Sequence, residues 1–364
     1  GGKYLFEDIK SQMELLVEVK AYLLNLDEEY RGTENLADTT YESYLKHKLF
    51  SDERLPEEKK PETEDDKQAK KEDEFEDEPY KRFSPPTKEH VEKFLREGGD
   101  NTNFKGITLT MMEEQLNGSY RAVFDGVASA DECQKLANLG LTMGHAGDGY
   151  KNDPSPHTVK EEFLGVNVNN ATWAAAKGEI GIEEPALYLN LSEKVRVITE
   201  AYFQLSTPLY FSYTHLVCRK ALSEQGEKGM HISHPVHSDN CVLRLEGKNI
   251  TCVKEFPAYT WRDYSAILYL NEDFTGGQFI FARMNQTVEA IVKPKCGRMV
   301  AFSAGVENLH GVLGIKQGTR CALALWFTLD ERYDEKQRYD AIKILRHLQQ
   351  QKESEKPNDG HKEL

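Results

Sequence analysis

Hydrophobic residues recur at intervals of three and four along residues 4–30, which is the spacing of one face of an α-helix. The apolar positions are Leu5, Ile9, Leu16, Val19, Leu23 and Leu26. No second helix follows that could cover this apolar face. We therefore assign residues 1–50 to a helical segment that either packs on the main domain or is the remnant of an upstream helical region.

The pattern changes completely between residues 51 and 80, where aliphatic residues almost disappear. Residues 57–78 carry twelve Asp or Glu against five Lys, a net charge of −7 out of −15 for the whole chain. Such a segment cannot bury enough apolar surface to offset the entropy of ordering it. We predict a disordered acidic linker at residues 51–82, and favour a solvated charged loop over an acidic binding tail.

Helical patterns return inside the next region, which we assign to one domain at residues 83–330. A helix is predicted at residues 129–140, with Ser129 as its N-cap and Gly140 as its end. A second helix is predicted at 188–205. Its core candidates are Leu189, Val195, Ile198 and Phe203.

Short runs rich in β-branched and aromatic residues dominate the chain after residue 207. The predicted strands are 208–219, 265–271, 277–283, 297–304 and 319–329. Turns rich in Gly and Pro separate them. Helices first and many short strands afterwards favour a mainly β fold with a helical buttress, as an antiparallel barrel or jelly roll.

One more amphipathic helix is predicted after the last strand, at residues 334–350. Its apolar positions are Ile342, Leu345 and Leu348. We assign residues 331–350 to this C-terminal helix. The tail at 351–364 is expected to be disordered.

Charge and hydropathy exclude two classes of partner. Outside the acidic linker the chain is mildly acidic and has no basic run, so we expect no nucleic acid or anionic membrane surface as a partner. No apolar stretch approaches the roughly 18 residues that a membrane-spanning helix needs, so none is predicted.

Three features of the sequence favour the endoplasmic reticulum lumen. Five N-x-S/T sequons predict a glycoprotein, at Asn117, Asn170, Asn190, Asn249 and Asn285. The six cysteines suit an oxidising compartment, although their pairing cannot be read from the sequence. The final HKEL resembles the HDEL retrieval signal, with Lys in place of Asp.

The stretch HPVHSDN, residues 234–240, carries the strongest indication of chemistry. On a strand, His237 and Asp239 would project from the same face because they are two residues apart. His310, between the predicted strands at 297–304 and 319–329, is the candidate third ligand. Two histidines and one carboxylate form the ligand set of non-haem Fe(II) oxygenases, which leaves positions open for a bidentate keto acid and for O2.

Arg320 supports this hypothesis because it directly precedes the apolar run CALALWF, residues 321–327. An arginine that points into a core needs a carboxylate partner, and no acidic residue is close in sequence. A bound dicarboxylate would supply that partner through paired hydrogen bonds. A keto acid could then bind iron at one end and Arg320 at the other.

Other interpretations of these residues remain open from the sequence. His310 could be an ordinary histidine in a glycine-flanked turn, and Arg320 could belong to a structural ion pair. His231, His234 and His237 could form a zinc cluster, but no cysteine or histidine pair completes the four ligands of a structural zinc site.

Several motifs together resemble a known family. They are H-x-D at His237–Asp239, LYLN at 268–271, the Gly-Gly turn at 276–277, PKCGR at 294–298, AFSA at 301–304, LHGV at 309–312 and Arg320. This pattern resembles the catalytic domain of iron- and 2-oxoglutarate-dependent prolyl hydroxylases. The segments HPVHSDNC, GVENLHGV and CALALWFTLDERYDE are most similar to the collagen prolyl 3-hydroxylases, the leprecan family. The resemblance covers about residues 83–340.

The resemblance implies a double-stranded β-helix fold, residence in the endoplasmic reticulum and an upstream helical region. It implies that His237, Asp239 and His310 bind Fe(II), and that Arg320 binds the C5 carboxylate of 2-oxoglutarate. The implied reaction hydroxylates prolines of procollagen chains and releases succinate and CO2, with L-ascorbate restoring oxidised iron. Other collagen-modifying proteins of the same compartment are expected partners.

The substrate contacts and the exact reaction stay open at this stage. Four aromatic residues could stack on proline rings, although core positions are commoner for such residues: Tyr213, Tyr259, Trp261 and Tyr269. A prolyl 4-hydroxylase or a lysyl hydroxylase would use the same iron chemistry. A catalytically silent procollagen chaperone or scaffold is the alternative from another class.

Overall fold

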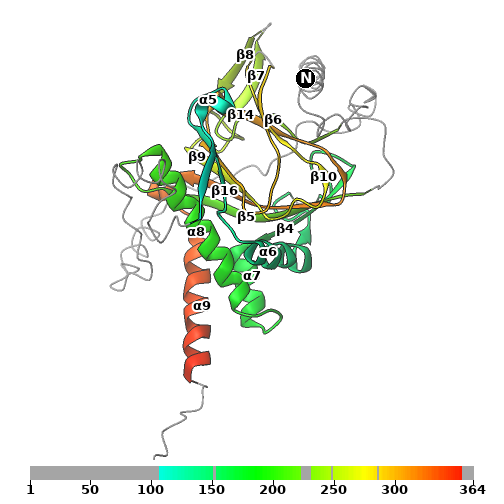
Figure 1. Cartoon of the computed structure of the whole chain (residues 1–364). Coiled ribbons are helices and arrows are strands. Elements are labelled where there is room, and N and C mark those ends of the chain that lie inside the picture. Colours follow the sequence, from blue (N-terminus) through cyan, green and yellow to red (C-terminus); the bar gives the residue numbers. More distant parts are fainter. Residues whose placement is uncertain (1–105, 151–152, 223–230, 247–248, 285–286, 355–364) are drawn as a thin grey trace, which may run out of the picture.

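The computed structural model describes residues 106–150, 153–222, 231–246, 249–284 and 287–354 (Figure 1). The predicted helix at 4–30 and the predicted linker at 51–82 lie outside these residues. So do residues 355–364 of the predicted tail.

Two antiparallel sheets form the body of the protein (Figure 1). The larger has eight strands in the order β1-β2-β13-β9-β16-β5-β4-β3, and the smaller has four in the order β12-β11-β14-β6. The strands of the larger sheet are β1 Thr108–Met111, β2 Arg121–Asp125, β3 His145–Ala146, β4 Glu161–Asn167, β5 Tyr210–Ala221, β9 Tyr264–Tyr269, β13 Met299–Ser303 and β16 Thr319–Thr328. Those of the smaller sheet are β6 Ile232–His237, β11 Phe279–Ala282, β12 Val288–Val292 and β14 Leu309–Leu313.

The chain alternates between these sheets, because β5, β9, β13 and β16 of the larger sheet are separated in sequence by strands of the smaller one. This interleaving is the double-stranded β-helix, or jelly roll, and it confirms the predicted fold class. Two further strand pairs flank the body: β7 Val242–Glu246 with β8 Asn249–Val253, and β10 Thr275–Gly276 with β15 Ile315–Gln317.

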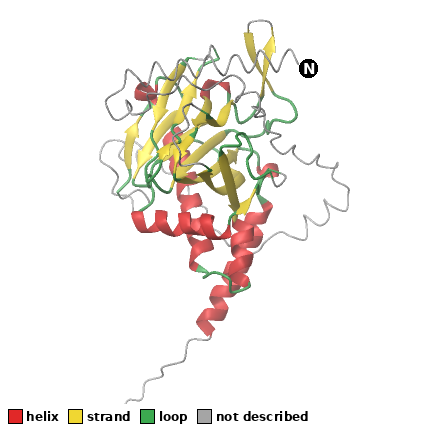
Figure 2. Ribbon diagram, turned by 90° about the vertical axis from the view of Figure 1, so that its right-hand side faces the viewer, coloured by secondary structure: helices red, strands yellow, loops and turns green. Residues whose placement is uncertain are grey.

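Helices cover the outer face of the larger sheet, and Figure 2 shows most of them gathered on one side of the strands. They are α6 Ala130–Met143, α7 Val168–Ala176, α8 Glu183–Phe203 and α9 Lys336–Ser354. The short helix α5 Glu113–Leu116 lies elsewhere, because its Leu116 packs in the cluster between the two sheets. One buried cluster joins α6, α8 and the outer face of the sheet, and a second, rich in phenylalanine, lies between the two sheets. Alternate residues of β16 serve the two clusters: Leu323 faces the helices and Ala322 faces the other sheet.

The N-terminus of α6 confirms the predicted cap. Ser129 Oγ accepts a hydrogen bond from the backbone N–H of Glu132, and the Glu132 carboxylate accepts one from the Ser129 N–H, which is a capping box. The predicted end at Gly140 is wrong, because the helix continues to Met143. Gly140 is instead a packing residue: an added Cβ would lie 3.0 Å from the Sγ of Cys218.

The other helices are longer than predicted. α8 begins at Glu183, since an acidic first turn with Pro185 starts it before the first aliphatic residue of the predicted stripe. α9 runs to Ser354, and its predicted core residues Ile342 and Leu345 are buried. Within the described residues, no helix combines the length and the apolar character needed to cross a membrane.

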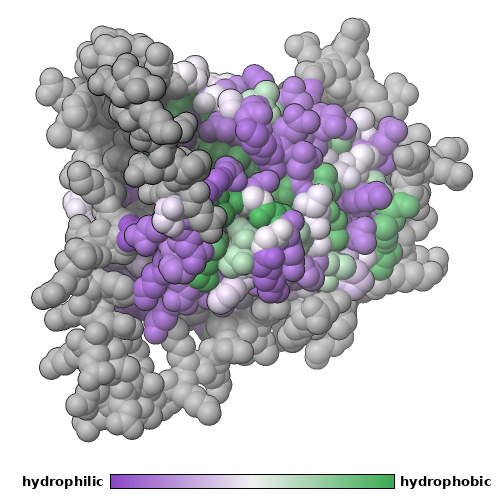
Figure 3. All heavy atoms as spheres, turned by 90° about the horizontal axis from the view of Figure 1, so that it is seen from below, coloured by the Kyte–Doolittle hydropathy of each residue, from purple (hydrophilic) through white to green (hydrophobic). Residues whose placement is uncertain are grey.

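Hydrophobic side chains on the face seen from below form separate patches among hydrophilic ones (Figure 3).

Two disulfides reinforce the strands. Cys218–Cys321 joins the adjacent strands β5 and β16, and Cys241–Cys252 joins the turn after β6 to β8.

Candidate metal centre

The three predicted metal ligands converge at one end of the smaller sheet. His237 ends β6 and is paired directly with His310 of β14. The Nε2 atom of His237 lies 3.5 Å from Oδ1 of Asp239, and that of His310 lies 3.6 Å from Oδ2. One ligand atom from each residue lies within 4.8 Å of the others, and no other such group exists among the described residues.

One detail of the sequence prediction is corrected here. Asp239 does not lie on a strand, because β6 ends at His237 and Asp239 belongs to the turn that follows. His310 is a buried position of β14, as expected of a third ligand on a returning strand, and not the turn histidine of the alternative interpretation. The ligands therefore meet through a strand end and its turn, rather than through strand alternation alone.

Both histidines present a nitrogen lone pair to the shared centre. Nδ1 of His237 lies 2.8 Å from the carbonyl oxygen of Pro235, and Nδ1 of His310 lies 2.9 Å from that of Asn308. A carbonyl oxygen can only accept, so Nδ1 must carry the proton in each ring. Nε2 is then unprotonated in the neutral imidazole and is ready to bind a metal.

Asp239 is buried and hydrogen-bonded at both oxygens. Ser265 Oγ donates to Oδ2 at 2.6 Å, and Trp326 Nε1 donates to Oδ1 at 3.0 Å. Burial alone would raise the pKa of Asp239, but the positive charges of His310 and His237 in their protonated forms and of the Arg262 guanidinium outweigh it, so the pKa lies well below its usual range. The site therefore holds a carboxylate beside two imidazoles.

Arg320 lies on the inner face of the barrel, on the larger sheet. It lies on the same face of β16 as Ala322 and Trp326, since these residues are separated by even intervals. Ala322 belongs to the cluster between the sheets, and Trp326 reaches Asp239. Its side chain is buried and donates a 3.3 Å hydrogen bond from Nη1 to the carbonyl of Gly277. Burial lowers the pKa of Arg320, while nearby Tyr269 and Glu161 act to raise it.

A buried carboxylate that the sequence analysis missed lies near Arg320. Glu161 of β4 accepts hydrogen bonds from Ser233 Oγ at 2.7 Å and from the Ile315 N–H at 2.7 Å, and bonds His231 Nε2 at 3.0 Å. Burial acts to raise its pKa, but His231, Arg219 and Arg320 bring the pKa down to about 2. No signal in the segment EEFLGVN distinguishes this glutamate from an exposed one.

The same contacts argue against the zinc interpretation. His231 is engaged with Glu161, and His234 stacks between His157 and His237 with ring centroids 4.1 and 4.2 Å away. Only His237 of the three histidines contributes to the candidate metal group in the described residues.

Arg219 gives this part of the barrel a second guanidinium. It lies on β5 directly across from Arg320 and 3.7 Å from Glu161. Glu161 forms its ion pair with Arg219 and acts on Arg320 only electrostatically, so the Arg320 guanidinium keeps positive charge for an anionic ligand. The hydroxyl of Tyr269 is buried there without a hydrogen-bond partner among the described residues.

The four predicted substrate aromatics separate into two groups. Tyr269 is 1% exposed and belongs to the core between the sheets, which agrees with the favoured core interpretation and leaves it unable to stack on a substrate proline. Tyr213, Tyr259 and Trp261 are partly exposed. Tyr213 stacks on Trp326, and Trp261 contacts Tyr259 edge to face, with Arg262 lying over Tyr259.

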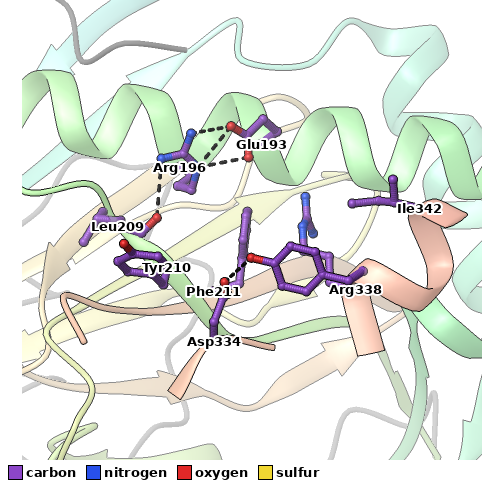
Figure 4. A pocket seen from close by; sticks show the side chains of 9 residues that line it. Glu193, Arg196, Leu209, Tyr210, Phe211, Asp334, Arg338 and Ile342 are labelled. Atoms are coloured by element: carbon purple, nitrogen blue, oxygen red, sulfur yellow. Dashed lines mark hydrogen bonds and ion pairs between the residues drawn. The ribbon is translucent and has the colours of Figure 1, made fainter. Parts of the chain in front are cut away.

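A small cavity of about 50 Å³ lies elsewhere, between α8, the start of β5 and the start of α9 (Figure 4). Its charged residues bond one another: Arg196 pairs with Glu193, and Tyr339 donates to Asp334. The cavity contains none of the four predicted site residues.

Comparison with known proteins agrees with this geometry. A model of the 2OG-Fe(II) oxygenase superfamily matches residues 228–328. The chain is 51% identical to prolyl 3-hydroxylase 1 of Homo sapiens over 259 residues, which make up 71% of this chain and 35% of that protein. It is 46% identical to prolyl 3-hydroxylase 2 of Homo sapiens over 274 residues, which make up 75% and 38% of the two chains.

The chain is a close homologue of proteins named prolyl 3-hydroxylase and contains a 2OG-Fe(II) oxygenase domain. It spans a little over a third of the length of these two relatives. The solved viral collagen prolyl hydroxylase of Paramecium Bursaria Chlorella virus-1, in complex with 2OG, has a TM-score of 0.36 and 16% identity, and covers 58% of this chain and 97% of its own.

The residues present fit the two cofactors that the superfamily name implies. Two imidazole lone pairs and a carboxylate are suitable donors for Fe(II) and leave further coordination positions open. A buried guanidinium and a partnerless tyrosine hydroxyl, on the facing sheet, are suitable for the distal carboxylate of 2-oxoglutarate. Arg219, Glu161, Ser265, Arg262 and Trp326 support these groups and were not predicted from the sequence.

Proposed function

We propose that this domain hydroxylates C3 of proline residues in collagen chains, using Fe(II), O2 and 2-oxoglutarate and releasing succinate and CO2. The observation that carries the proposal is the meeting of His237, Asp239 and His310 opposite the buried Arg320. Identity near 50% to relatives named prolyl 3-hydroxylase supports C3 of proline over other positions.

When bound, the iron and the keto acid supply the oxidising power that replaces C–H by C–OH. The chain supplies binding and orientation. His237 and His310 bind the metal through Nε2, and Asp239 contributes the negative charge that a dication requires. Arg320 and Tyr269 hold the far carboxylate, so the keto acid is fixed at both ends.

The core between the sheets keeps water from this site. Phe279 stacks on His310 at 5.3 Å between ring centroids, and Phe302 lies 4.6 Å from the same ring. An apolar wall on this side leaves the substrate to approach from elsewhere. The partly exposed group of Tyr213, Tyr259 and Trp261 is our candidate contact for proline rings, because flat aromatic faces suit such rings.

We also propose the endoplasmic reticulum lumen as the compartment, with L-ascorbate restoring oxidised iron and other collagen-modifying proteins as partners. The two closed disulfides support an oxidising compartment. Three of the sequon asparagines, Asn117, Asn170 and Asn190, are exposed, which supports a glycoprotein. A mobility shift on enzymatic removal of N-glycans would test this.

The test of the activity is incubation of the protein with Fe(II), ascorbate, 2-oxoglutarate and a proline-rich collagen peptide. We expect succinate, and 3-hydroxyproline identified by mass spectrometry after hydrolysis and separation of the isomers. A product hydroxylated at C4 or on lysine would assign another hydroxylase. Absence of succinate from the wild-type protein would favour a silent scaffold.

Two variants separate the roles in this reaction. Asp239→Ala should abolish succinate formation with little change in melting temperature, because the metal loses its anionic ligand. Arg320→Ala should raise the KM for 2-oxoglutarate at least tenfold by removing a charge-assisted pair. Arg332→Ala, an exposed arginine bonded to Asp330, is the matched control and should leave both quantities unchanged.

A further inference from the structure

Two cysteines remain outside the two closed disulfides. Cys133 lies in the second turn of α6 and is 1% exposed. Cys296 lies in the turn between β12 and β13 and is partly exposed. All six cysteines of the chain fall within the described residues, so no other thiol competes for either partner.

Shared hydrogen-bond acceptors bring the two side chains together. The carbonyl of Ser129 accepts the Cys133 N–H at 2.9 Å, and Cys296 Sγ lies 4.0 Å from the same oxygen. The carbonyl of Tyr269 accepts the Gly297 N–H at 3.0 Å, and Cys133 Sγ lies 3.9 Å from that oxygen. Burial raises the pKa of the Cys133 thiol far above its usual range, and a hydrogen bond with Cys296 adds to the rise.

Gly297 explains why the turn can lie so close to the start of α6. Its φ is +74°, which favours glycine, and an added Cβ would lie 2.3 Å from the carbonyl oxygen of Ala128. The Gly297 carbonyl accepts the N–H of Val127 at 3.0 Å. The backbone thus holds the neighbouring Cys296 against α6 through contacts on both sides of the turn.

We propose that Cys133 and Cys296 form a third disulfide site, which is closed by exchange with a disulfide oxidant. The thiolate of the accessible Cys296 attacks one sulfur of the oxidant and releases the first thiol. Cys133 then loses its proton, attacks Cys296 Sγ and releases the second thiol. The two cysteines lose two electrons and two protons, and the oxidant disulfide becomes two thiols.

The site adjoins the strand that carries Tyr269. The Tyr269 N–H donates to the Arg298 carbonyl at 2.8 Å, and its carbonyl accepts from Gly297. A bond between Cys133 and Cys296 would fasten α6 to this turn, and therefore to the back of β9, without touching the metal ligands. The inference does not depend on the proposed hydroxylation.

The test is peptide mapping of the whole chain, secreted through an oxidising compartment, with thiols alkylated under denaturing conditions before a tryptic digest without reductant. We expect residues 122–135 linked to residues 296–298, as one species that reduction separates. Linked peptides containing Cys218–Cys321 and Cys241–Cys252 in the same digest are the control for oxidation.

A count of free thiols in denaturant gives a second readout. The proposal predicts none in the wild-type protein and one in the Cys296→Ser variant, because Cys133 would then lose its partner. Two free thiols in the wild type, in a sample whose other disulfides are closed, would overturn it. So would a linkage of Cys296 to any cysteine other than Cys133.

Discussion

At the scale of single residues, the hydrogen bonds behind the candidate metal ligands decide how well these side chains are oriented. Each ligand histidine is bonded by Nδ1 to a carbonyl two residues before it in the chain. Asp239 depends on residues far away in sequence, namely Ser265 and Trp326. Local backbone contacts therefore orient the two histidines, whereas contacts between distant segments of the chain orient the aspartate.

Trp326→Phe is expected to weaken metal binding about 10- to 100-fold, which is the usual cost of losing a partner of a metal ligand. Phenylalanine keeps an aromatic ring on Tyr213 but cannot donate to Asp239. The measurement is a titration with Mn²⁺ or Fe²⁺ under anaerobic conditions. Trp261→Phe, which loses only a 3.0 Å bond to Ser212, is the control. Equal effects of the two variants would contradict the assigned role.

At the scale of elements, the residue just before α9 has a carboxyl group with an unusual proton affinity. Glu335 is buried, its Oε1 accepts a 3.3 Å bond from the Thr214 N–H, and its Oε2 has no hydrogen-bond partner among the described residues. Burial raises its pKa to about 7, although Arg338 acts to lower it. The folded state therefore binds a proton that the unfolded chain releases at lower pH.

The sign of the pH dependence follows from this difference. A carboxyl group whose pKa is raised from 4.5 to about 7 by folding favours the folded state most at low pH, and this contribution is lost as the pH rises through that window. Glu335→Gln should then stabilise the protein at pH 8 by on the order of 2–3 kcal/mol and have little effect near pH 4.5.

Urea denaturation at several pH values measures this effect. Asp340→Asn, on an exposed position of the same helix, is the control and should shift neither curve. A Glu335→Gln variant whose stability falls in parallel with the wild type from pH 4.5 to 8 would show that Glu335 is ionised throughout.

The disulfide between β5 and β16 is expected to stabilise the larger sheet far more than the disulfide near the metal site does. Cys218–Cys321 spans 103 residues and Cys241–Cys252 spans 11, and a longer closed loop costs the unfolded chain more entropy. Replacing both Cys218 and Cys321 by Ala should lower the free energy of unfolding by about 2–5 kcal/mol. The matching Cys241/Cys252 double variant should lose less, as measured in urea.

At the scale of the whole molecule, the sequence predicted the fold class and named the residues of the candidate site, three of which the structure brings together, but not their surroundings. His237, Asp239, His310 and Arg320 form a spaced pattern in a strand-rich region, so local features reveal them. Strand boundaries in the larger sheet were also close, since β5 and β16 are long apolar runs.

The supporting residues escaped prediction because strand pairing, rather than local sequence, brings them to the site. Glu161 lies beside Arg219 and His231 because β4 pairs with β5, and Trp326 reaches Asp239 from β16. The prediction for Gly140 was wrong for a similar reason. A glycine is needed there because α6 packs closely against β5, and not because the helix ends.

The two ends of the candidate site belong to different sheets: the imidazoles come from β6 and β14, while Arg320 and Tyr269 come from β16 and β9. A single small molecule bound at both ends would link the smaller sheet to the larger one. By mass action it should raise the free energy of unfolding by about 2.7 kcal/mol at a concentration 100 times its Kd. Backbone amides of β14 and β9 should then exchange with deuterium more slowly together, whereas a ligand held by only one layer would protect that layer alone.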